Sequence, residues 1–165
     1  MLEIDDNLHE PILLVDTNDN PAGTASKWDA HKQGWLHRAF SLIVFNKTGE
    51  ILLQQRAPGK YHSAGLWTNT CCSHPRVNEA VEVAIHRRLQ EEMAFDCPIT
   101  FIDTLHYQSP PLENGLVENE FLYLYTGTTE RSEFRPNAHE VCDWRWIAPD
   151  ALKREVADRP DDFSY

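Results

Sequence analysis

Basic residues are scarce in this 165-residue sequence, which has 15 Lys and Arg against 26 Asp and Glu and a formal net charge of −11 at pH 7. Proteins that bind nucleic acid gather Lys and Arg against the phosphate backbone. The composition therefore argues against a nucleic-acid partner. A phosphorylated small substrate is compatible with the charge if part of the acidic excess holds a metal ion.

Long apolar runs are also missing. No stretch approaches the roughly 20 apolar residues that span a membrane as a helix. The N-terminal segment, Met1 to Asn7, has neither the basic start nor the apolar centre of a secretory signal. We therefore expect a soluble, cytoplasmic protein without a membrane partner.

Cysteine is limited to four residues, Cys71, Cys72, Cys97 and Cys142. Cytoplasmic thiols stay reduced, and an adjacent pair such as Cys71 and Cys72 has poor geometry for a disulfide. We expect no disulfide. Any role of these residues is then chemical or lies in packing.

The sequence contains no internal repeat, no low-complexity segment and no linker that could separate two domains. A chain of this length, with 41% hydrophobic residues, can bury about two-thirds of its unfolded surface in one core. We expect a single domain over residues 1–165. A monomer is the expected state, with a dimer left open.

The hydrophobic pattern predicts strands before and after one strong helix. Strands are expected at residues 12–15, 39–45, 51–56, 101–107, 117–125 and 140–147. The helix is expected to run from an N-cap at Asn78 to Met93, and a last helix to begin near Pro149. The apolar face of the first helix consists of Val81, Ala84, Ile85 and Leu89. This order indicates a mixed α/β or α+β fold.

Imidazole and carboxylate side chains that could hold a metal ion occur in three segments. They are His31, His37, His74, Glu118 and Glu120. In a strand, Glu118 and Glu120 would project to one face, about 6.5 Å apart. Nitrogen and oxygen donors suit Zn²⁺, Mn²⁺ or a similar divalent ion. Each histidine, taken singly, is as compatible with a surface position.

Other candidates are a thiol and several cations. Cys72 stands two residues before His74, and a thiol near a metal and a histidine can lose its proton near neutral pH. Arg56, Lys60 and Arg88 could bind the oxygens of a diphosphate. The alternatives are a small core residue for Cys72 and solvated charges for the cations.

The helical region resembles the Nudix box, G-x5-E-x7-R-E-U-x-E-E-x-G-U with U apolar. Its positions are occupied here by Ser73, Glu79, Arg87, Arg88, Leu89, Glu91, Glu92, Ala94 and Phe95. Both glycines and one acid are replaced. The resemblance implies the Nudix scaffold, a mixed sheet sandwiched between helices in a single domain, without the complete acidic cluster of the hydrolases.

Two further blocks resemble type I isopentenyl-diphosphate isomerases, a divergent branch of the Nudix superfamily. They are Trp67-Thr-Asn-Thr-Cys-Cys-Ser-His-Pro75 and Val117-Glu-Asn-Glu120. The similarity runs from about Ile12 to Ser164 and includes residues 30–31, 36–40 and 56–60. Nine residues that match in order exceed a chance motif.

The resemblance implies a role for each matching residue. The implied metal ligands are His31, His37, His74, Glu118 and Glu120, with Glu92 holding Mg²⁺ on the substrate diphosphate. The implied catalytic residues are Cys72 and Glu120, with Tyr107 beside the glutamate. The implied counter-charges to the diphosphate are Lys27, Arg56, Lys60 and Arg88. The family places a tryptophan after the pair corresponding to Phe163 and Ser164; among Trp35, Trp67, Tyr107 and Tyr165, we expect Trp67 with Tyr107 to take its place.

The implied reaction interconverts isopentenyl and dimethylallyl diphosphate. A proton is added at one end of the alkene and another is removed on the opposite side, through a tertiary carbocation, which requires an acid and a base on two faces of a dry pocket. The alternative is a Nudix pyrophosphohydrolase acting on a nucleoside diphosphate derivative. A Nudix-like binding protein without activity is a third possibility.

Overall fold

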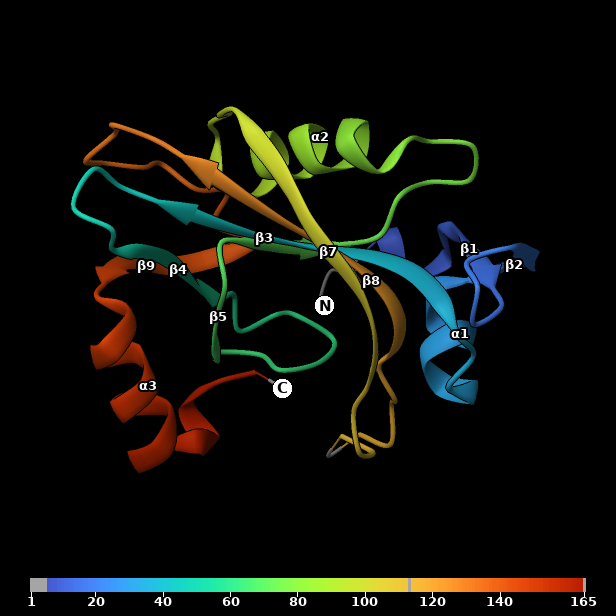
Figure 1. Cartoon of the computed structure of the whole chain (residues 1–165). Coiled ribbons are helices and arrows are strands. Elements are labelled where there is room, and N and C mark those ends of the chain that lie inside the picture. The colour runs from blue at the N-terminus through green and yellow to red at the C-terminus, as the bar shows by residue number, and fades with distance from the viewer. Residues whose placement is uncertain (1–5, 113, 165) are drawn as a thin grey trace.

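The protein is described by a computed structural model that covers residues 6–112 and 114–164 (Figure 1). The strands are β1 (Pro11–Val15), β2 (Pro21–Ser26), β3 (His37–Phe45), β4 (Ile51–Arg56), β5 (Trp67–Thr68), β6 (Cys71–Ser73), β7 (Ile99–Gln108), β8 (Asn119–Thr128) and β9 (Val141–Ile147). The helices are α1 (Lys27–Gln33), α2 (Val81–Met93) and α3 (Pro149–Asp158), with 3-10 turns η1 (Asp6–His9) and η2 (Pro160–Asp162).

The strands of the described chain form one mixed sheet with β3 at its centre. β3 runs antiparallel to β1, β4 and β6 and parallel to β8. β7 pairs with β8, whereas β5 and β9 pair with β4. Because β6 and β8 both pair with β3, segments distant in the sequence meet along one strand.

The predicted strands at residues 39–45 and 51–56 form a hairpin of β3 and β4, but the two strands diverge. They pair at Phe45 and Ile51, next to the turn. Further along, the hydroxyl of Thr70 accepts a hydrogen bond from Val44 N (2.9 Å) and donates one to Leu52 O (2.7 Å). Thr70 thus occupies the gap between the strands and carries the segment before β6 into the sheet.

Helix α2 covers one face of the sheet and confirms the predicted apolar face. Ala84, Ile85 and Leu89 are completely buried, and Val81 packs against the same core. α2 and α3 lie on opposite sides of the sheet in Figure 1, as the resemblance implies. α1 contacts β1 and β2 at one end. Within the described residues, no helix combines the length and apolar character needed to cross a bilayer.

The predicted N-cap of α2 is wrong. Asn78 has φ 66°, a left-handed conformation that asparagine tolerates, and the helix begins only after Ala80. Instead of an Asn side chain, the Glu79 carboxylate organises this end. It accepts hydrogen bonds from Arg76 N (2.8 Å) and from Arg87 (2.7 Å).

The other predicted strands and the helix at Pro149 are present, with two differences. The strand predicted at residues 117–125 begins at Asn119, so Glu118 precedes it. The short elements β2, α1, β5 and β6 were not predicted. Three of them, α1, β5 and β6, carry residues of the cavity described next.

Candidate active site

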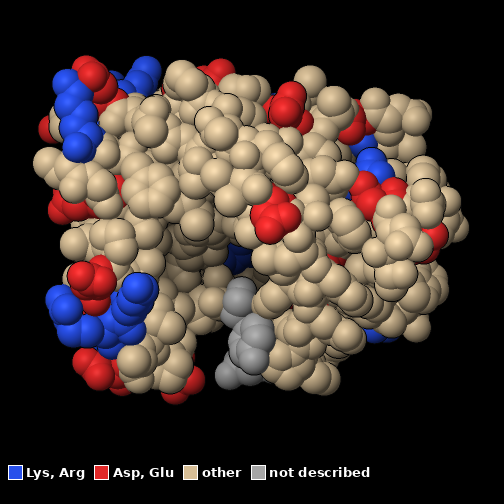
Figure 2. Space-filling view, in the orientation of Figure 1, with Lys and Arg blue, Asp and Glu red and all other residues tan. Residues whose placement is uncertain are grey.

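A cavity of about 210 Å³ lies beside β3, β6 and β8. Figure 2 shows the face of the molecule hollowed, with a Lys or Arg side chain at the base of the hollow. Charged groups dominate the cavity wall: Lys27, Arg56, Lys60, Arg88, Glu92, Glu118, Glu120 and Glu140. The uncharged lining includes Cys72, His62, His74, Tyr107, Leu112 and Leu122.

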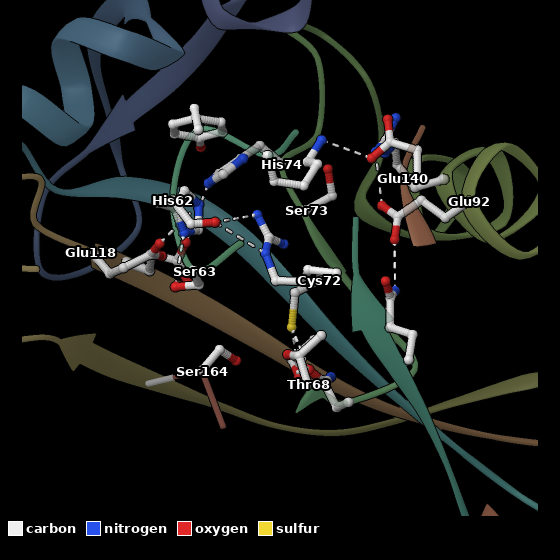
Figure 3. A pocket seen from close by; sticks show the side chains of 18 of the residues that line it. His62, Ser63, Thr68, Cys72, Ser73, His74, Glu92, Glu118, Glu140 and Ser164 are labelled. Atoms are coloured by element: carbon white, nitrogen blue, oxygen red, sulfur yellow. Dashed lines mark hydrogen bonds and ion pairs between the residues drawn. The ribbon is translucent and has the colours of Figure 1, made fainter. Parts of the chain in front are cut away.

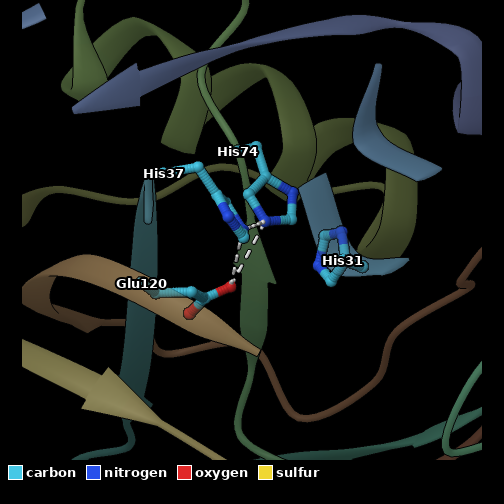
Figure 4. Close-up of side chains that lie close together, drawn as sticks. All are labelled: His31, His37, His74 and Glu120. Carbon is cyan, nitrogen blue, oxygen red and sulfur yellow. Dashed lines mark hydrogen bonds and ion pairs between the residues drawn. The ribbon is translucent and has the colours of Figure 1, made fainter. Parts of the chain in front are cut away.

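Three imidazoles and one carboxylate meet beside this cavity (Figure 4). The donors are His31 from α1, His37 from β3, His74 after β6 and Glu120 from β8, and their ligand atoms all lie within 4.8 Å of one another. His74 Nε2 is 3.1 Å from His37 Nε2 and 3.2 Å from Glu120 Oε1. The convergence predicted for these four residues is confirmed.

The histidine rings are oriented as in protein metal sites. His31 Nδ1 is 2.6 Å from the carbonyl of Lys27, and His37 Nδ1 is 2.7 Å from that of Trp35. A carbonyl only accepts, so each Nδ1 carries the hydrogen and each Nε2 presents a lone pair. His31 Nε2 is buried without a hydrogen-bond partner among the described residues. A divalent cation would satisfy these lone pairs, so the residues fit a metal ion.

The surroundings of His31, His74 and Glu120 favour the form of each side chain that binds metal. Burial, with the neighbouring His74 and His37, lowers the pKa of His31 to about 3, and burial lowers that of His74 to about 4. Burial acts to raise the pKa of Glu120, but hydrogen bonds with His37 and His74 hold it well below its usual range. At neutral pH His31 and His74 therefore offer neutral imidazoles, and Glu120 offers an ionised carboxylate.

Glu118 lies beside this group of four donors and not within it. Its backbone is fixed, because its N–H donates to Ser109 Oγ (3.0 Å) and its carbonyl accepts from Ser109 N (2.8 Å). Its carboxylate faces the cavity, 3.4 Å from His62 Nε2. Burial and the charge of Glu120 raise the pKa of Glu118 well above its usual range. A nearby cation would reverse this shift.

Cys72 faces the cavity from β6 (Figure 3). Its Sγ is 2.8 Å from Asn69 Oδ1 and 3.5 Å from Ser41 Oγ. Although the thiol is open to the cavity, the protein around it desolvates it and raises its pKa to about 12. Without a metal ion the thiol therefore keeps its proton at neutral pH, because burial outweighs the nearby donors. The loss of the proton beside a bound metal stays a prediction. The four cysteines are free thiols, as predicted.

Glu120 and Cys72 reach the cavity from opposite edges of β3. Glu120 in β8 is paired with His37, and Cys72 in β6 is paired with Ser41. Tyr107 in β7 is the cross-strand partner of Glu120 and also lines the cavity. The structure thus brings these three side chains to one cavity, and their catalytic roles stay a prediction.

The predicted diphosphate-binding cations line the same cavity, and two of them, Lys60 and Arg88, pair with acids. Lys60 Nζ is 2.8 Å from Glu140 Oε2 (Figure 3). Arg88 is 2.8 Å from Glu92 Oε1 and 3.5 Å from Glu140 Oε2. Burial acts to lower the pKa of Arg88, but Glu92 and Glu140 raise it, so the guanidinium stays charged. Gln54 donates to Glu92 (2.8 Å) and fixes its carboxylate.

Sequence comparisons show the family to which this chain belongs. A model of the NUDIX domain matches residues 35–164. Isopentenyl-diphosphate Delta-isomerase 2 of Photorhabdus laumondii is 46% identical over 157 residues, which cover 95% of this chain and 88% of the relative. The Burkholderia multivorans isopentenyl-diphosphate Delta-isomerase is 47% identical with the same coverage. This chain belongs to the isopentenyl-diphosphate delta-isomerases of the Nudix family.

Solved structures share the Nudix fold of this isomerase family. A Deinococcus radiodurans protein superposes with a TM-score of 0.75 at 17% identity, over 91% of this chain and 90% of its own. The MutT protein of Methanosarcina mazei gives a TM-score of 0.59 at 14% identity, over 74% and 81% of the two chains. Such low identities show the fold alone.

The structure contradicts the place predicted for Trp67. Its ring lies under the Arg145 guanidinium, 4.5 Å from the ring centroid, and it is not among the described residues that line the cavity. Side chains alternate along a strand, so Thr68 faces the cavity instead. Trp35 is 46% exposed. Tyr165 lies outside the described residues.

Several residues that line the isomerase cavity were not predicted as site residues, among them His62, Asn69 and Glu140. Asn69 lies inside the matching block, but only its contact with Cys72 shows that it touches the thiol. Glu140 was placed in a strand, and its link to Lys60 spans 80 positions of sequence. The sequence around His62 shows no motif that would predict a functional role. No local signal in the sequence reports such long-range contacts.

Proposed function

We propose that this chain interconverts isopentenyl diphosphate and dimethylallyl diphosphate through a tertiary carbocation. The observation that carries the proposal is the shared cavity of Cys72 and Glu120, which lie at opposite edges of β3. An unactivated alkene needs a proton donor on one face and an acceptor on the other. The names of relatives at 46–47% identity support the same reaction. The product class belongs to isoprenoid biosynthesis.

We assign the first proton to Glu120, assisted by Tyr107, and the opposite face of the alkene to Cys72. Tyr107 in β7 is the cross-strand neighbour of Glu120 in β8. Its hydroxyl can therefore hydrogen-bond to groups beside the Glu120 carboxylate. Leu122 and Leu112 line the cavity as well and exclude water from the five-carbon group. Asn69 and Ser41 fix the sulfur position.

The His and Glu group is proposed to hold Mn²⁺ or Zn²⁺. His31, His37, His74 and Glu120 supply nitrogen and oxygen donors that suit either ion, and Glu118 is proposed as a further ligand. A bound divalent ion would supply a fixed positive charge that orients the carboxylates and lowers the pKa of groups beside it.

The cations are proposed to bind the substrate diphosphate together with Mg²⁺. Arg88 pairs with Glu92, the residue proposed to hold Mg²⁺. The metal ion and the guanidinium would therefore bind the same phosphate oxygens. Lys27, Arg56 and Lys60 contribute further positive charge along the cavity. Four cations with Mg²⁺ can hold a diphosphate despite the acidic composition of the chain.

The alternative, a Nudix pyrophosphohydrolase, needs the complete acidic box. Arg88 replaces one of these acids. Its guanidinium donates hydrogen bonds to Glu91 and Glu92, and its positive charge offsets the negative charge available for Mg²⁺. A binding protein without activity has no use for a thiol and a four-donor group in one cavity.

Product analysis tests the proposal. The purified chain is incubated with isopentenyl diphosphate and Mg²⁺, and the allylic isomer is separated from free phosphate. Allylic product is expected. Phosphate release would support the hydrolase, and binding without product would support the inactive protein.

Other predictions from the sequence stay predictions. They are a single domain over residues 1–165, a monomeric state with a dimer left open, a cytoplasmic location, and the absence of nucleic-acid and membrane partners.

A further inference from the structure

A fourth imidazole, that of His62, faces the metal-ligand group from the loop of residues 57–66 between β4 and β5. The His62 and His31 rings are nearly parallel, with an interplanar angle of 25° and centroids 6.0 Å apart. Tyr61 packs edge-on against His62 at 4.4 Å. The His62 side chain is only 14% exposed and lines the cavity. None of the roles proposed above uses it.

The protein holds His62 firmly in place. Arg56 donates to its carbonyl through Nε (3.3 Å) and Nη2 (3.2 Å). The next residue, Ser63, has φ 50°, a left-handed conformation that is uncommon for serine and persists where the surroundings determine the backbone. Ser63 Oγ is 3.2 Å from His62 Nδ1. When this hydroxyl donates to Nδ1, the ring hydrogen resides on Nε2.

His62 Nε2 points at a proposed ligand. It lies 3.4 Å from Glu118 Oε1 (Figure 3). The backbone of Glu118 is fixed by Ser109, so the freedom that remains belongs to its side chain. An imidazole N–H at this distance attracts one carboxylate oxygen, and the second oxygen can then turn toward a neighbouring ion. Glu120, a member of the four-donor group, lies close enough for its charge to raise the pKa of Glu118.

We propose that His62 is a positioning residue that holds the Glu118 carboxylate toward the divalent ion of the His31, His37, His74 and Glu120 group. The proposal rests on the proposed metal site and names a residue outside its ligands. Hydrogen-bond partners of ligating groups typically change metal affinity by about 10–100-fold when they are removed. His62 thereby acts on the ion through Glu118.

A double-mutant cycle with Mn²⁺ as the probe tests this role. The dissociation constant of Mn²⁺ is measured by competition with a chelator in the metal-stripped full chain and in its His62→Ala, Glu118→Gln and doubly substituted variants. We expect His62→Ala to weaken Mn²⁺ binding by about 10–100-fold. In the Glu118→Gln background the same substitution should have little further effect, because its target carboxylate is gone.

Two more variants separate positioning from packing. His62→Gln keeps an N–H donor and should recover part of the affinity, while circular dichroism reports folding. His86→Ala is the matched control, because the partly exposed His86 pairs with Asp96, and neither lines the cavity. It should leave the Mn²⁺ dissociation constant unchanged.

The outcomes distinguish this inference from the proposed function. An unchanged Mn²⁺ dissociation constant in His62→Ala overturns the role of His62. The same holds if His62→Ala weakens Mn²⁺ binding equally in the unaltered and the Glu118→Gln backgrounds. Absence of Mn²⁺ binding by the unaltered chain overturns it together with the metal site. Weaker Mn²⁺ binding in His62→Ala, combined with no allylic product from the unaltered chain, supports His62 and rejects the isomerase proposal alone.

Discussion

Two adjacent cysteines in β6 have different surroundings. Cys71 is completely buried in the core, whereas Cys72 lines the cavity. We expect Cys72→Ser to lower kcat by about 10²–10⁴-fold, the range for loss of a general acid or base, because the pKa of an alcohol lies far above that of a thiol and the serine cannot readily act as the base. Steady-state kinetics with isopentenyl diphosphate measures this change.

Cys71→Ser is the matched control for that substitution. A hydroxyl in the core should lower the free energy of unfolding by about 1–2 kcal/mol and leave kcat nearly unchanged. Urea unfolding and kinetics measure the two effects. Near-normal turnover in Cys72→Ser with a turnover defect in Cys71→Ser would show that the catalytic thiol has been assigned one residue out of register.

His74 contacts both His37 and Glu120 in the metal-ligand group. If one ion joins these residues, His74→Ala removes a ligand and should reduce both the bound metal per chain and kcat. Elemental analysis of the purified variant, with His86→Ala as the control, measures the metal. Lower turnover with full metal occupancy would remove His74 from the site.

At the scale of elements, α2 ends in a conformation that suits glycine better than the residue present. Ala94 follows the helix with φ 55° and is exposed, at a position where the Nudix box has glycine. A left-handed conformation costs a residue with a Cβ roughly 1 kcal/mol. We expect Ala94→Gly to raise the free energy of unfolding by about that amount in urea titrations, with unchanged kcat. A lower free energy of unfolding in Ala94→Gly would show that the backbone at Ala94 is not strained.

Long elements were predictable from the sequence and short ones were not. The apolar spacing of α2 and the apolar runs of β3 and β4 extend over enough residues to be recognised in the sequence. α1 has seven residues, and its signals are the Ser26 hydroxyl that accepts from Asp29 N and Gly34 at φ 65°. β5 and β6 have two and three residues, and pairing with longer strands holds them in place.

The site was predictable where the matching blocks placed its residues. The gathering of His31, His37, His74 and Glu120 depends on α1, β3, β6 and β8, and no local pattern reveals it. The resemblance supplied this information. The resemblance failed at Trp67 because it took no account of the alternation of side chains along the strand. The raised pKa of Cys72 depends on burial, which the sequence does not show.

At the scale of the whole molecule, the buried imidazoles link stability to pH. In the metal-free protein burial lowers the pKa of His31 to about 3 and that of His74 to about 4, whereas an unfolded histidine titrates near pH 6.5. Between about pH 6.5 and 4 the unfolded chain therefore binds protons that the folded chain does not. In this window the free energy of unfolding should decrease as the pH is lowered, by about 1.4 kcal/mol per pH unit for each histidine.

Urea unfolding of the metal-stripped protein at pH 7 and pH 5 measures this effect. The free energy of unfolding should be lower at pH 5, and His74→Ala should reduce the slope. Equal or higher stability at pH 5 would contradict the buried, neutral state of these rings.

The most direct test of the account follows hydrogen from solvent into product. The chain is incubated with isopentenyl diphosphate, Mg²⁺ and Mn²⁺ in D₂O, and the products are analysed by ¹H, ²H and ³¹P NMR. We expect dimethylallyl diphosphate with deuterium in a methyl group and an intact diphosphate, whereas Cys72→Ser exchanges hydrogen at one carbon at most. Release of phosphate, or allylic product without solvent deuterium, would contradict an isomerisation that adds one proton and removes another.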